Sequence, residues 1–301
     1  MTGAVRKAGF GSGLYLRSFS KRTSRAPSVS RARKRSLDGL VLWRWYLSTV
    51  QILIAEHLAY PGDGFGLQQA VLEEVAAGAR GPTALMWTSS RYVGATHLET
   101  RFPGFGEAVR LAEEVGFPVL LRNSGGGAVA ANEGSISFSL TFPVEDLRHG
   151  LYERYAEGVE LVAAALRRVG VEAEAGEVEG EFCPGAYSVR SGGRRGVKHA
   201  GLAQRVTRRA ARLESLILVS KTGELVPVLR NFYGSLDVPF RSGSIGDLKG
   251  VSVPQVIGAL STEVGERYAA EEARVDEGLL SRARSHRNLW RAPSGTTSTA
   301  R

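Results

Sequence analysis

Hydrophobic residues recur every three or four positions in several stretches of the chain, which is the spacing of one face of an α-helix. Gly78, Gly116 and Gly170 follow three of these stretches within three residues, and glycine commonly ends helices. The pattern predicts helices at residues 67–75, 105–115, 147–169, 254–267 and 269–284.

A second pattern, strict alternation of hydrophobic and hydroxyl-bearing residues, covers residues 135–142. Ile136, Phe138, Leu140 and Phe142 alternate with serine and threonine, so their side chains share one face of a β-strand. We expect this strand to have one packed face and one polar face. Shorter apolar runs predict further strands at 84–88, 118–122, 186–190, 199–205 and 216–220.

The order of these elements predicts the fold class. Several predicted strands follow one another directly along the chain, as in β-hairpins, and the predicted helices lie in separate stretches of the sequence. This order favours an α/β fold of the α+β type, in which a mixed, largely antiparallel sheet is flanked by helices. We expect a single domain at residues 37–291, with disordered tails at 1–36 and 292–301.

The basic residues of the chain are concentrated near its N-terminus. Residues 1–35 contain ten Lys or Arg and no Asp or Glu; the rest of the chain has 29 basic against 30 acidic residues, although the formal net charge of the whole chain is +9. The positive charge therefore belongs to the tail, and we expect no nucleic-acid partner. The tail has the Arg-rich, Ser-rich composition of an organelle transit peptide; a disordered bacterial extension or a start codon assigned too early has the same composition.

The single cysteine and the five scattered histidines exclude several kinds of site. No intramolecular disulfide and no multi-cysteine zinc or iron–sulfur site is possible, and the histidines lack metal-ligand spacing, so we expect neither metal nor cofactor. This cysteine usage fits a reducing compartment, the cytoplasm. The longest apolar run, residues 40–55, is interrupted by Arg44 and Gln51 and is too short for a membrane span, so we expect no membrane partner.

Three consecutive glycines at 125–127 lie between the strand predicted at 118–122 and a second strand. Bare backbone amides in such a loop can approach an oxygen-rich ligand. The loop lacks the Gly-Lys-Ser/Thr ending of a P-loop and leads into a strand, unlike a dinucleotide-binding loop. An Arg-Asn-Ser segment directly before the glycines suits a carboxylate, phosphate or oxyanion. A tight turn between strands is the purely structural alternative.

The lone Cys183 lies in a Phe-Cys-Pro-Gly turn after the long predicted helix, and Lys198 follows on the next hairpin. A cation beside a cysteine favours the reactive thiolate, so this pair and the glycine loop supply the parts of an acyl-transfer site. The structural alternatives are a small buried apolar cysteine and a solvated surface lysine. Tyr92, in an apolar segment, lines either a pocket or the core.

Two segments resemble the biotin/lipoate protein ligase family. Residues 122–129, followed by residues 134–139, look like the family's arginine–serine–triple-glycine segment, which in that family lines the site of the acyl group. Residues 198–205 (Lys-His-Ala-Gly-Leu-Ala-Gln-Arg) resemble the signature that contains the family's catalytic lysine. With weaker similarity at 67–75 and 92–94, the resemblance covers roughly residues 60–235.

Around Cys183 the sequence is similar to the octanoyltransferases of this family, in which the matching cysteine carries a thioester. The resemblance implies that Cys183 takes an octanoyl group from glycine cleavage H protein and passes it to a lysine in the lipoyl domains of 2-oxoacid dehydrogenases. Lys198 would keep the cysteine ionised, and the glycine loop would stabilise the tetrahedral oxyanion. The other residues implied to bind substrate are Tyr92, Arg122, Asn123, Ser124, Gly125, Gly126, Gly127, Ala128 and Gly201.

Other activities agree with the same residues. The octanoyl donor could instead be acyl carrier protein. An ATP-dependent lipoate ligase would have the same signatures but would not need Cys183, and a non-catalytic acyl-binding module would bind the acyl group without a covalent step. Residues 190–197 lengthen the hairpin before Lys198 relative to the family's pattern, so the sequence leaves the distance between Cys183 and Lys198 open.

Overall fold

The computed structural model describes residues 49–146 and 150–293. Its larger sheet has eight strands in the order β11-β1-β2-β6-β10-β9-β8-β7. These strands are β1 (Val50–Ile54), β2 (Thr83–Trp87), β6 (Ser135–Pro143), β7 (Glu174–Ala175), β8 (Ser188–Ser191), β9 (Val197–Val206), β10 (Ala210–Leu218) and β11 (Ala270–Ala273). The pairs from β2 to β7 are antiparallel, and β1 is parallel to both of its neighbours. The mixed, largely antiparallel sheet is therefore confirmed.

A smaller sheet has the order β4-β3-β5, with β3 (Tyr92–Thr96) in the centre. β4 (Val119–Arg122) pairs with β3 in parallel, and β5 (Val129–Ala131) pairs with it antiparallel. The glycine loop joins β4 to β5 and so passes from one side of β3 to the other. It is not a tight turn between two paired strands.

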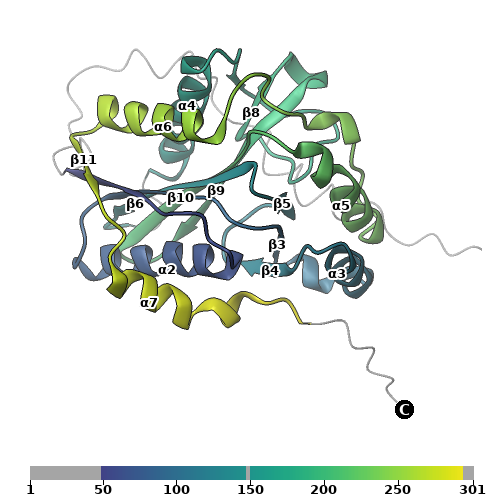
Figure 1. Cartoon of the computed structure of the whole chain (residues 1–301), viewed down its shortest axis with the longest axis horizontal. Helices are drawn as coiled ribbons and strands as arrows, with labels where there is room; N and C mark the ends of the chain where they lie inside the picture. The colour runs from purple at the N-terminus through teal and green to yellow at the C-terminus, as the bar shows by residue number, and fades with distance from the viewer. Residues whose placement is uncertain (1–48, 147–149, 294–301) are drawn as a thin grey trace, which may run out of the picture. The chain divides into compact units, whose positions relative to one another are not determined.

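Helices cover both faces of the larger sheet (Figure 1). On one face lie α4 (Leu151–Arg168) and α6 (Val253–Arg267), and on the other lie α2 (Pro61–Ala77) and α7 (Glu277–Ser285). Two further helices, α3 (Phe105–Glu114) and α5 (Thr222–Ser235), pack together beside the smaller sheet. The predicted helices at 67–75, 105–115 and 254–267 are confirmed as parts of α2, α3 and α6. The helix predicted at 147–169 is α4, and residues 147–149 lie outside the described residues.

The strand predicted at residues 135–142 is β6, but both of its faces are buried. Its four hydrophobic side chains belong to the core that includes α4 and α6. The serine and threonine side chains between them point toward α2, which packs against β6 on the opposite face. The expectation of a single packed face is wrong, because the small hydroxyl side chains of the polar face are also buried, beneath a helix.

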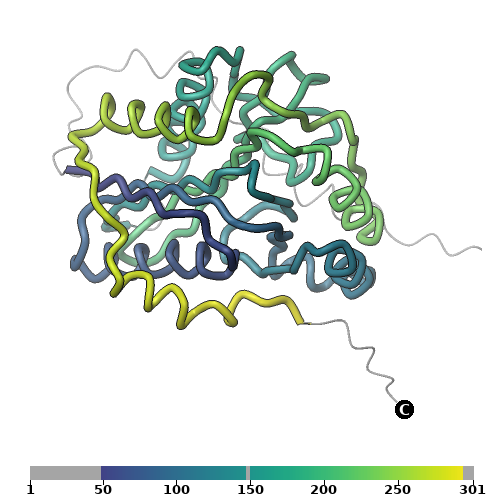
Figure 2. The backbone as a smooth tube through the Cα atoms, viewed as in Figure 1, coloured from purple at the N-terminus to yellow at the C-terminus, as the bar shows by residue number. Residues whose placement is uncertain are grey.

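The C-terminal part of the chain also differs from its prediction. The helix expected at 269–284 begins only at Glu277, where the Asp276 side chain accepts a hydrogen bond from the Leu279 amide at 2.8 Å. Before it, β11 lies beside β1, so segments from the two ends of the described chain pair in parallel (Figure 2).

Of the described elements, β1, β3, β7, β11 and α5 were not predicted. β1 occupies part of the apolar run at 40–55, and none of the described helices is long and apolar enough to cross a membrane. The tail predicted at 1–36 lies outside the described residues. Of the tail predicted at 292–301, residues 292 and 293 are described, and the Ala292 amide donates a hydrogen bond to the Val119 carbonyl at 3.0 Å.

The close contact between α2 and α7 depends on Gly66. A Cβ at this position would lie 2.3 Å from the carbonyl oxygen of Ala283, a backbone atom that cannot rotate away. We expect Gly66→Ala to lower the free energy of unfolding by about 1–3 kcal/mol, the usual cost of overpacking. Gly258→Ala, in α6 with no atom near the added Cβ, is the matched control and should leave stability unchanged or raise it by up to about 1 kcal/mol. Thermal unfolding followed by circular dichroism measures both; equal effects would contradict the assignment.

Candidate functional site

Cys183 lies in the segment between β7 and β8, in a backbone conformation that is rare for a residue with a side chain. Its φ is 44°, in the left-handed region. The Cys183 amide donates a hydrogen bond to the Tyr233 hydroxyl at 2.7 Å, and this hydroxyl donates to the Ala128 carbonyl at 2.8 Å. One tyrosine of α5 thus holds the cysteine turn and the glycine loop together. Backbone strain that surrounding contacts maintain in this way is typical of functional sites.

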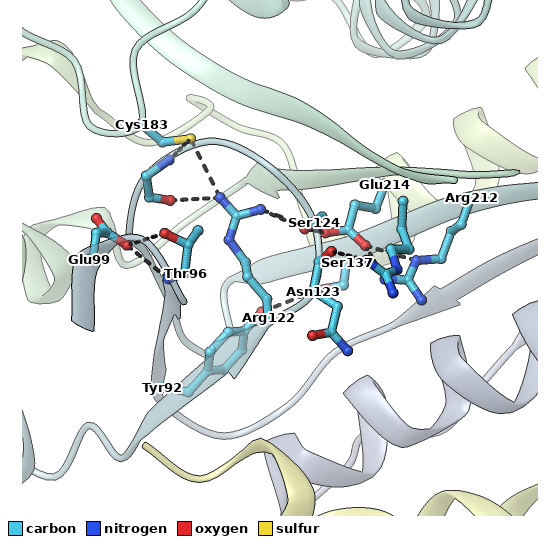
Figure 3. A network of polar contacts seen from close by, with 12 residues as sticks. Tyr92, Thr96, Glu99, Arg122, Asn123, Ser124, Ser137, Cys183, Arg212 and Glu214 are labelled. Atoms are coloured by element: carbon cyan, nitrogen blue, oxygen red, sulfur yellow. Dashed lines mark hydrogen bonds and ion pairs between the residues drawn. The ribbon is translucent and has the colours of Figure 1, made fainter. Parts of the chain in front are cut away.

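The half-buried Cys183 sulfur faces the glycine loop (Figure 3). Sγ accepts hydrogen bonds from the Gly127 amide at 3.1 Å and from Arg122 Nη2 at 3.7 Å. A Cβ at position 126 would lie 2.6 Å from Sγ and 3.0 Å from Arg122 Nη2, and Gly126 has φ 97°. Glycine is therefore required at 126 both by its conformation and by the closeness of the sulfur.

Arg122, at the end of β4, is buried and fixed on several sides. Nη1 donates to Ser124 Oγ at 2.7 Å, Nη2 donates to the Gly127 carbonyl at 2.6 Å, and Nη1 lies 3.7 Å from Glu214 Oε1. Burial opposes its positive charge, but the negative charges of Cys183, Glu214 and other neighbours outweigh burial and raise the pKa of Arg122. The guanidinium is therefore a permanent cation beside the sulfur.

Glu214, on β10, connects this cation to a second arginine. Its carboxylate accepts hydrogen bonds from Ser124 Oγ and from Arg212 Nε at 2.9 Å, and Arg212 Nη2 forms an ion pair with it at 2.8 Å. Arg212 is 4% exposed, so both arginines of this network are buried. Figure 3 shows the network running from the sulfur through Arg122 to Arg212.

Glu99, in the short 3-10 helix η3 (Glu99–Arg101), fixes the other end of the glycine loop. Its Oε1 accepts from the Ala128 amide at 2.6 Å, and Oε2 accepts from the amide and hydroxyl of Thr96. Burial raises the pKa of Glu99, and these hydrogen bonds partly oppose the shift. The Ala128 amide is thus occupied by a side chain of the protein itself.

Lys198, on β9, is fully buried below the cysteine turn. Nζ donates to the carbonyl oxygens of Phe182 at 2.9 Å and of Cys183 at 3.0 Å, and it lies 3.4 Å from Glu181 Oε1. Gly201 makes room for this side chain, since a Cβ there would lie 3.0 Å from Lys198 Cε. The structure thus brings Lys198 to the cysteine turn, despite the lengthened hairpin, with its ammonium on carbonyl oxygens.

Glu181 organises the turn from within. It is 1% exposed, and its carboxylate accepts hydrogen bonds from the amides of Val178 at 3.0 Å and Gly185 at 3.2 Å and from Ser188 Oγ at 2.8 Å. Together with the Lys198 contact, these bonds satisfy both carboxylate oxygens in a buried place. The conformation of the segment that contains Cys183 is therefore fixed from both sides.

Cys183 and Lys198 line one largely apolar cavity of about 60 Å³. Its wall comes from α2, both sheets and the cysteine turn, with Phe65, Trp87, Val129, Phe182, Leu202 and Leu216 as the main apolar residues. Tyr92 also lines it, with Oη 3.3 Å from Ser137 Oγ, and burial raises the pKa of Tyr92 to about 12. A neutral phenol and hydrocarbon side chains suit an acyl chain rather than an ion.

The predicted substrate-binding residues are distributed unevenly around the site. Tyr92, Arg122 and Gly201 line the cavity. Gly126 and Gly127 approach the sulfur, and Ser124 and Ala128 are held by Glu214 and Glu99. Gly125 is exposed. The Asn123 side chain points away from Cys183 and borders a separate recess (Figure 3).

Sequence reasoning missed Glu181, Glu214, Glu99 and Tyr233. Glu181 lies two residues before the cysteine, so proximity in sequence was an available signal. The others reach the site from β10, η3 and α5, and no local pattern marks them. Among the described residues, no group of three or more His, Cys, Asp or Glu side chains could hold a metal ion.

His199, the neighbour of Lys198 on β9, is a buried histidine. Its Nε2 lies 2.8 Å from Ser191 Oγ, and burial lowers the pKa of His199 to about 4. The usual pKa of histidine is 6.5. Between pH 6.5 and about pH 4, His199 therefore binds a proton in the unfolded chain but not in the folded chain. We therefore expect this residue to lower the free energy of unfolding by about 3 kcal/mol as pH falls through that window.

Denaturant unfolding at a series of pH values measures this effect, with His199→Gln as the control. The variant should lose this part of the pH dependence. An identical slope in the variant would contradict the assignment.

Comparison with known proteins identifies a family and agrees with the fold. The family model described as lipoyl protein ligase A/B catalytic domain matches residues 61–273. The octanoyl-[GcvH]:protein N-octanoyltransferase of Bacillus velezensis is 34% identical over 172 residues, which is 57% of this chain and 59% of that protein. The protein of the same name from Geobacillus kaustophilus is 28% identical over 230 residues, or 76% of this chain and 75% of that protein.

Solved structures show the same fold at lower sequence identity. The crystal structure of lipoate-protein ligase A bound with ATP has a TM-score of 0.65 at 20% identity and covers 80% of this chain and 94% of that chain. A putative lipoate protein ligase from T. acidophilum with bound lipoic acid has a TM-score of 0.63 at 19% identity, covering 80% of this chain and 95% of that chain.

Proposed function

Because the chain belongs to the lipoyl protein ligase A/B catalytic domain family, we propose that it is an octanoyltransferase of protein lipoylation. In this proposal it takes octanoyl from glycine cleavage H protein and transfers it to a lysine in the lipoyl domains of 2-oxoacid dehydrogenases. The donor is the one that the names of the two relatives give. The observation that carries the proposal is the Cys183 sulfur at an apolar cavity, in contact with the Gly127 amide and Arg122.

In the first half of the reaction the Cys183 thiolate attacks the carbonyl carbon of the octanoyl-lysine amide. A C–S bond forms, and the carbonyl oxygen becomes an oxyanion. The intermediate collapses when the C–N bond breaks and the leaving lysine amine takes a proton from the Lys198 ammonium. The octanoyl group is then held as a thioester, and the part of its hydrocarbon chain next to the sulfur faces the apolar lining of the cavity.

The second half reverses these steps with another carrier. The amine of an acceptor lysine attacks the thioester carbon, Lys198 accepts the proton, and the thiolate leaves as the C–S bond breaks. In this proposal the Gly127 amide, 3.1 Å from Sγ, transfers its hydrogen bond from the thiolate to the oxyanion of the intermediate. Removing one such donor typically lowers the rate about 10²–10³-fold.

A lone cysteine nucleophile needs a reducing environment, so we place the reaction in the cytoplasm. We assign it to one catalytic domain, residues 37–291, as the sequence pattern predicts.

The test is the intact mass of the full chain after incubation with octanoylated glycine cleavage H protein. We expect a gain of one octanoyl group, located on Cys183 by peptide mapping and removed by neutral hydroxylamine, which cleaves thioesters. Parallel incubation with octanoyl-acyl carrier protein identifies the donor. Folded protein that gains no octanoyl group from either donor would contradict the proposal.

A further inference from the structure

We propose that Arg122, and not Lys198, is the cation that stabilises the Cys183 thiolate, while Lys198 fixes the cysteine turn and exchanges protons with the carrier lysines. This inference rests on the proposed function for its biological meaning, but its geometry is independent of any substrate. It replaces the expectation that Lys198 keeps the cysteine ionised.

The hydrogen bonds of Lys198 go to the backbone of the turn. Of its three N–H donors, two are used on the carbonyl oxygens of Phe182 and Cys183. The carboxylate of Glu181 lies 3.4 Å from Nζ and forms an ion pair with it. All three belong to the turn itself, so the ammonium holds the backbone that carries the sulfur rather than the sulfur.

The net charge of Lys198 is also cancelled locally. Its partner Glu181 is fully buried with it, and in a buried place a carboxylate 3.4 Å away offsets most of the field of an ammonium. A thiolate nearby therefore gains little electrostatic stabilisation from this pair. The main effect of the Lys198–Glu181 pair is therefore to fix the conformation of the turn.

Arg122 differs in both respects. Its Nη2 reaches Sγ directly, at 3.7 Å, while the Gly127 carbonyl and Ser124 fix the guanidinium plane. Its carboxylate neighbour, Glu214, also binds the buried Arg212. Arg122 also interacts with Glu99 across the glycine loop, but its Nη2 remains in direct contact with the sulfur, and a buried cation in contact with a thiolate favours ionisation.

Other titratable groups also face the turn and contribute to the electrostatic environment of the sulfur. Burial raises the pKa of Tyr155, on α4, to about 12, so its phenol stays neutral at the pH of the reaction. Glu99 lies on the far side of the glycine loop, where burial raises its pKa. The charged or titratable groups that face the sulfur or bind its neighbours are Arg122, Arg212, Lys198, Glu181, Glu99, Glu214, Tyr233, Tyr92 and Tyr155. Arg122 is the one cation among them with a hydrogen bond to the sulfur in the described structure.

The test is the rate of Cys183 alkylation by iodoacetamide against pH, in the full chain without any substrate. Because the chain has one cysteine, the intact mass reports this sulfur alone. We expect Arg122→Gln to move the midpoint of the rate profile upward by at least about one pH unit, and Lys198→Gln to move it by less than about half a unit. A larger shift for Lys198→Gln, equal shifts, or no shift for Arg122→Gln would overturn the proposal.

Arg122→Lys keeps the charge and covers the case in which Arg122→Gln does not fold, as judged by circular dichroism. Its midpoint should lie within about half a unit of that of the unaltered protein, whereas a neutral residue shifts it further. A shift above one unit in folded Arg122→Lys would overturn the charge argument. No acyl donor is needed for these measurements, so failure of the proposed transfer reaction is seen separately, in the octanoyl adduct test.

Discussion

Cys183→Ala is expected to lower octanoyl transfer between carrier proteins by at least about a thousand-fold, because losing a covalent nucleophile removes the whole two-step route. The protein should remain folded. The side chain is half-buried and small, and the turn around it is fixed by the Cys183 amide and carbonyl, which alanine retains. The measurement is the initial rate of transfer to a lipoyl domain, with unfolding temperature as the folding control.

The same variant separates the proposed reaction from that of an ATP-dependent ligase. A ligase activates a free acid as an adenylate and needs no thiolate, so Cys183→Ala would then keep its ATP-dependent activity. Retention of transfer activity in folded Cys183→Ala would remove the cysteine from the mechanism. Cys183→Ser is the stricter comparison, because its hydroxyl has a similar size but is far less ionised near neutral pH.

Elements with a regular pattern were predictable from sequence. The long amphipathic helix α4 and the alternating strand β6 follow directly from residue spacing, because one face of each packs on a continuous core. β11 was not predictable, since Ala270–Ala273 carries two glutamates and has no strand pattern. It is a strand because β1 offers it backbone hydrogen bonds, which is a tertiary effect.

The site was predictable to the extent that its residues stand in contiguous motifs. Arg122, the glycine loop, Cys183 and Lys198 were found in this way. The separate role of each residue was not predictable from sequence, because it depends on partners that are distant in sequence. Glu214 is 92 residues beyond Arg122, and Tyr233 is 50 residues beyond Cys183. The sequence predicts a cation near the sulfur, but it does not show that Glu181 offsets the charge of Lys198 while Arg122 contacts the sulfur.

Gly126→Ala is expected to lower transfer activity by about a hundred-fold or more while the fold is retained. The added methyl group would lie 2.6 Å from Sγ and 3.0 Å from Arg122 Nη2, so the sulfur, the guanidinium or the loop must move. A displacement of about 1 Å at reacting groups can cost about 10²-fold in rate. The φ of 97° adds backbone strain of about 1–3 kcal/mol, which should appear as a lower unfolding temperature.

Gly125→Ala is the matched control, because it adds the same methyl group to the same loop. No atom lies within 4 Å of a Cβ at Gly125, which is exposed and has no positive φ that would strain alanine. We therefore expect Gly125→Ala to keep near-normal activity. Comparable losses in both variants would mean that the loop needs glycine for its flexibility rather than for room at the sulfur. A loss confined to Gly126→Ala, with a changed alkylation profile of Cys183, would tie activity to the contact between sulfur, guanidinium and loop.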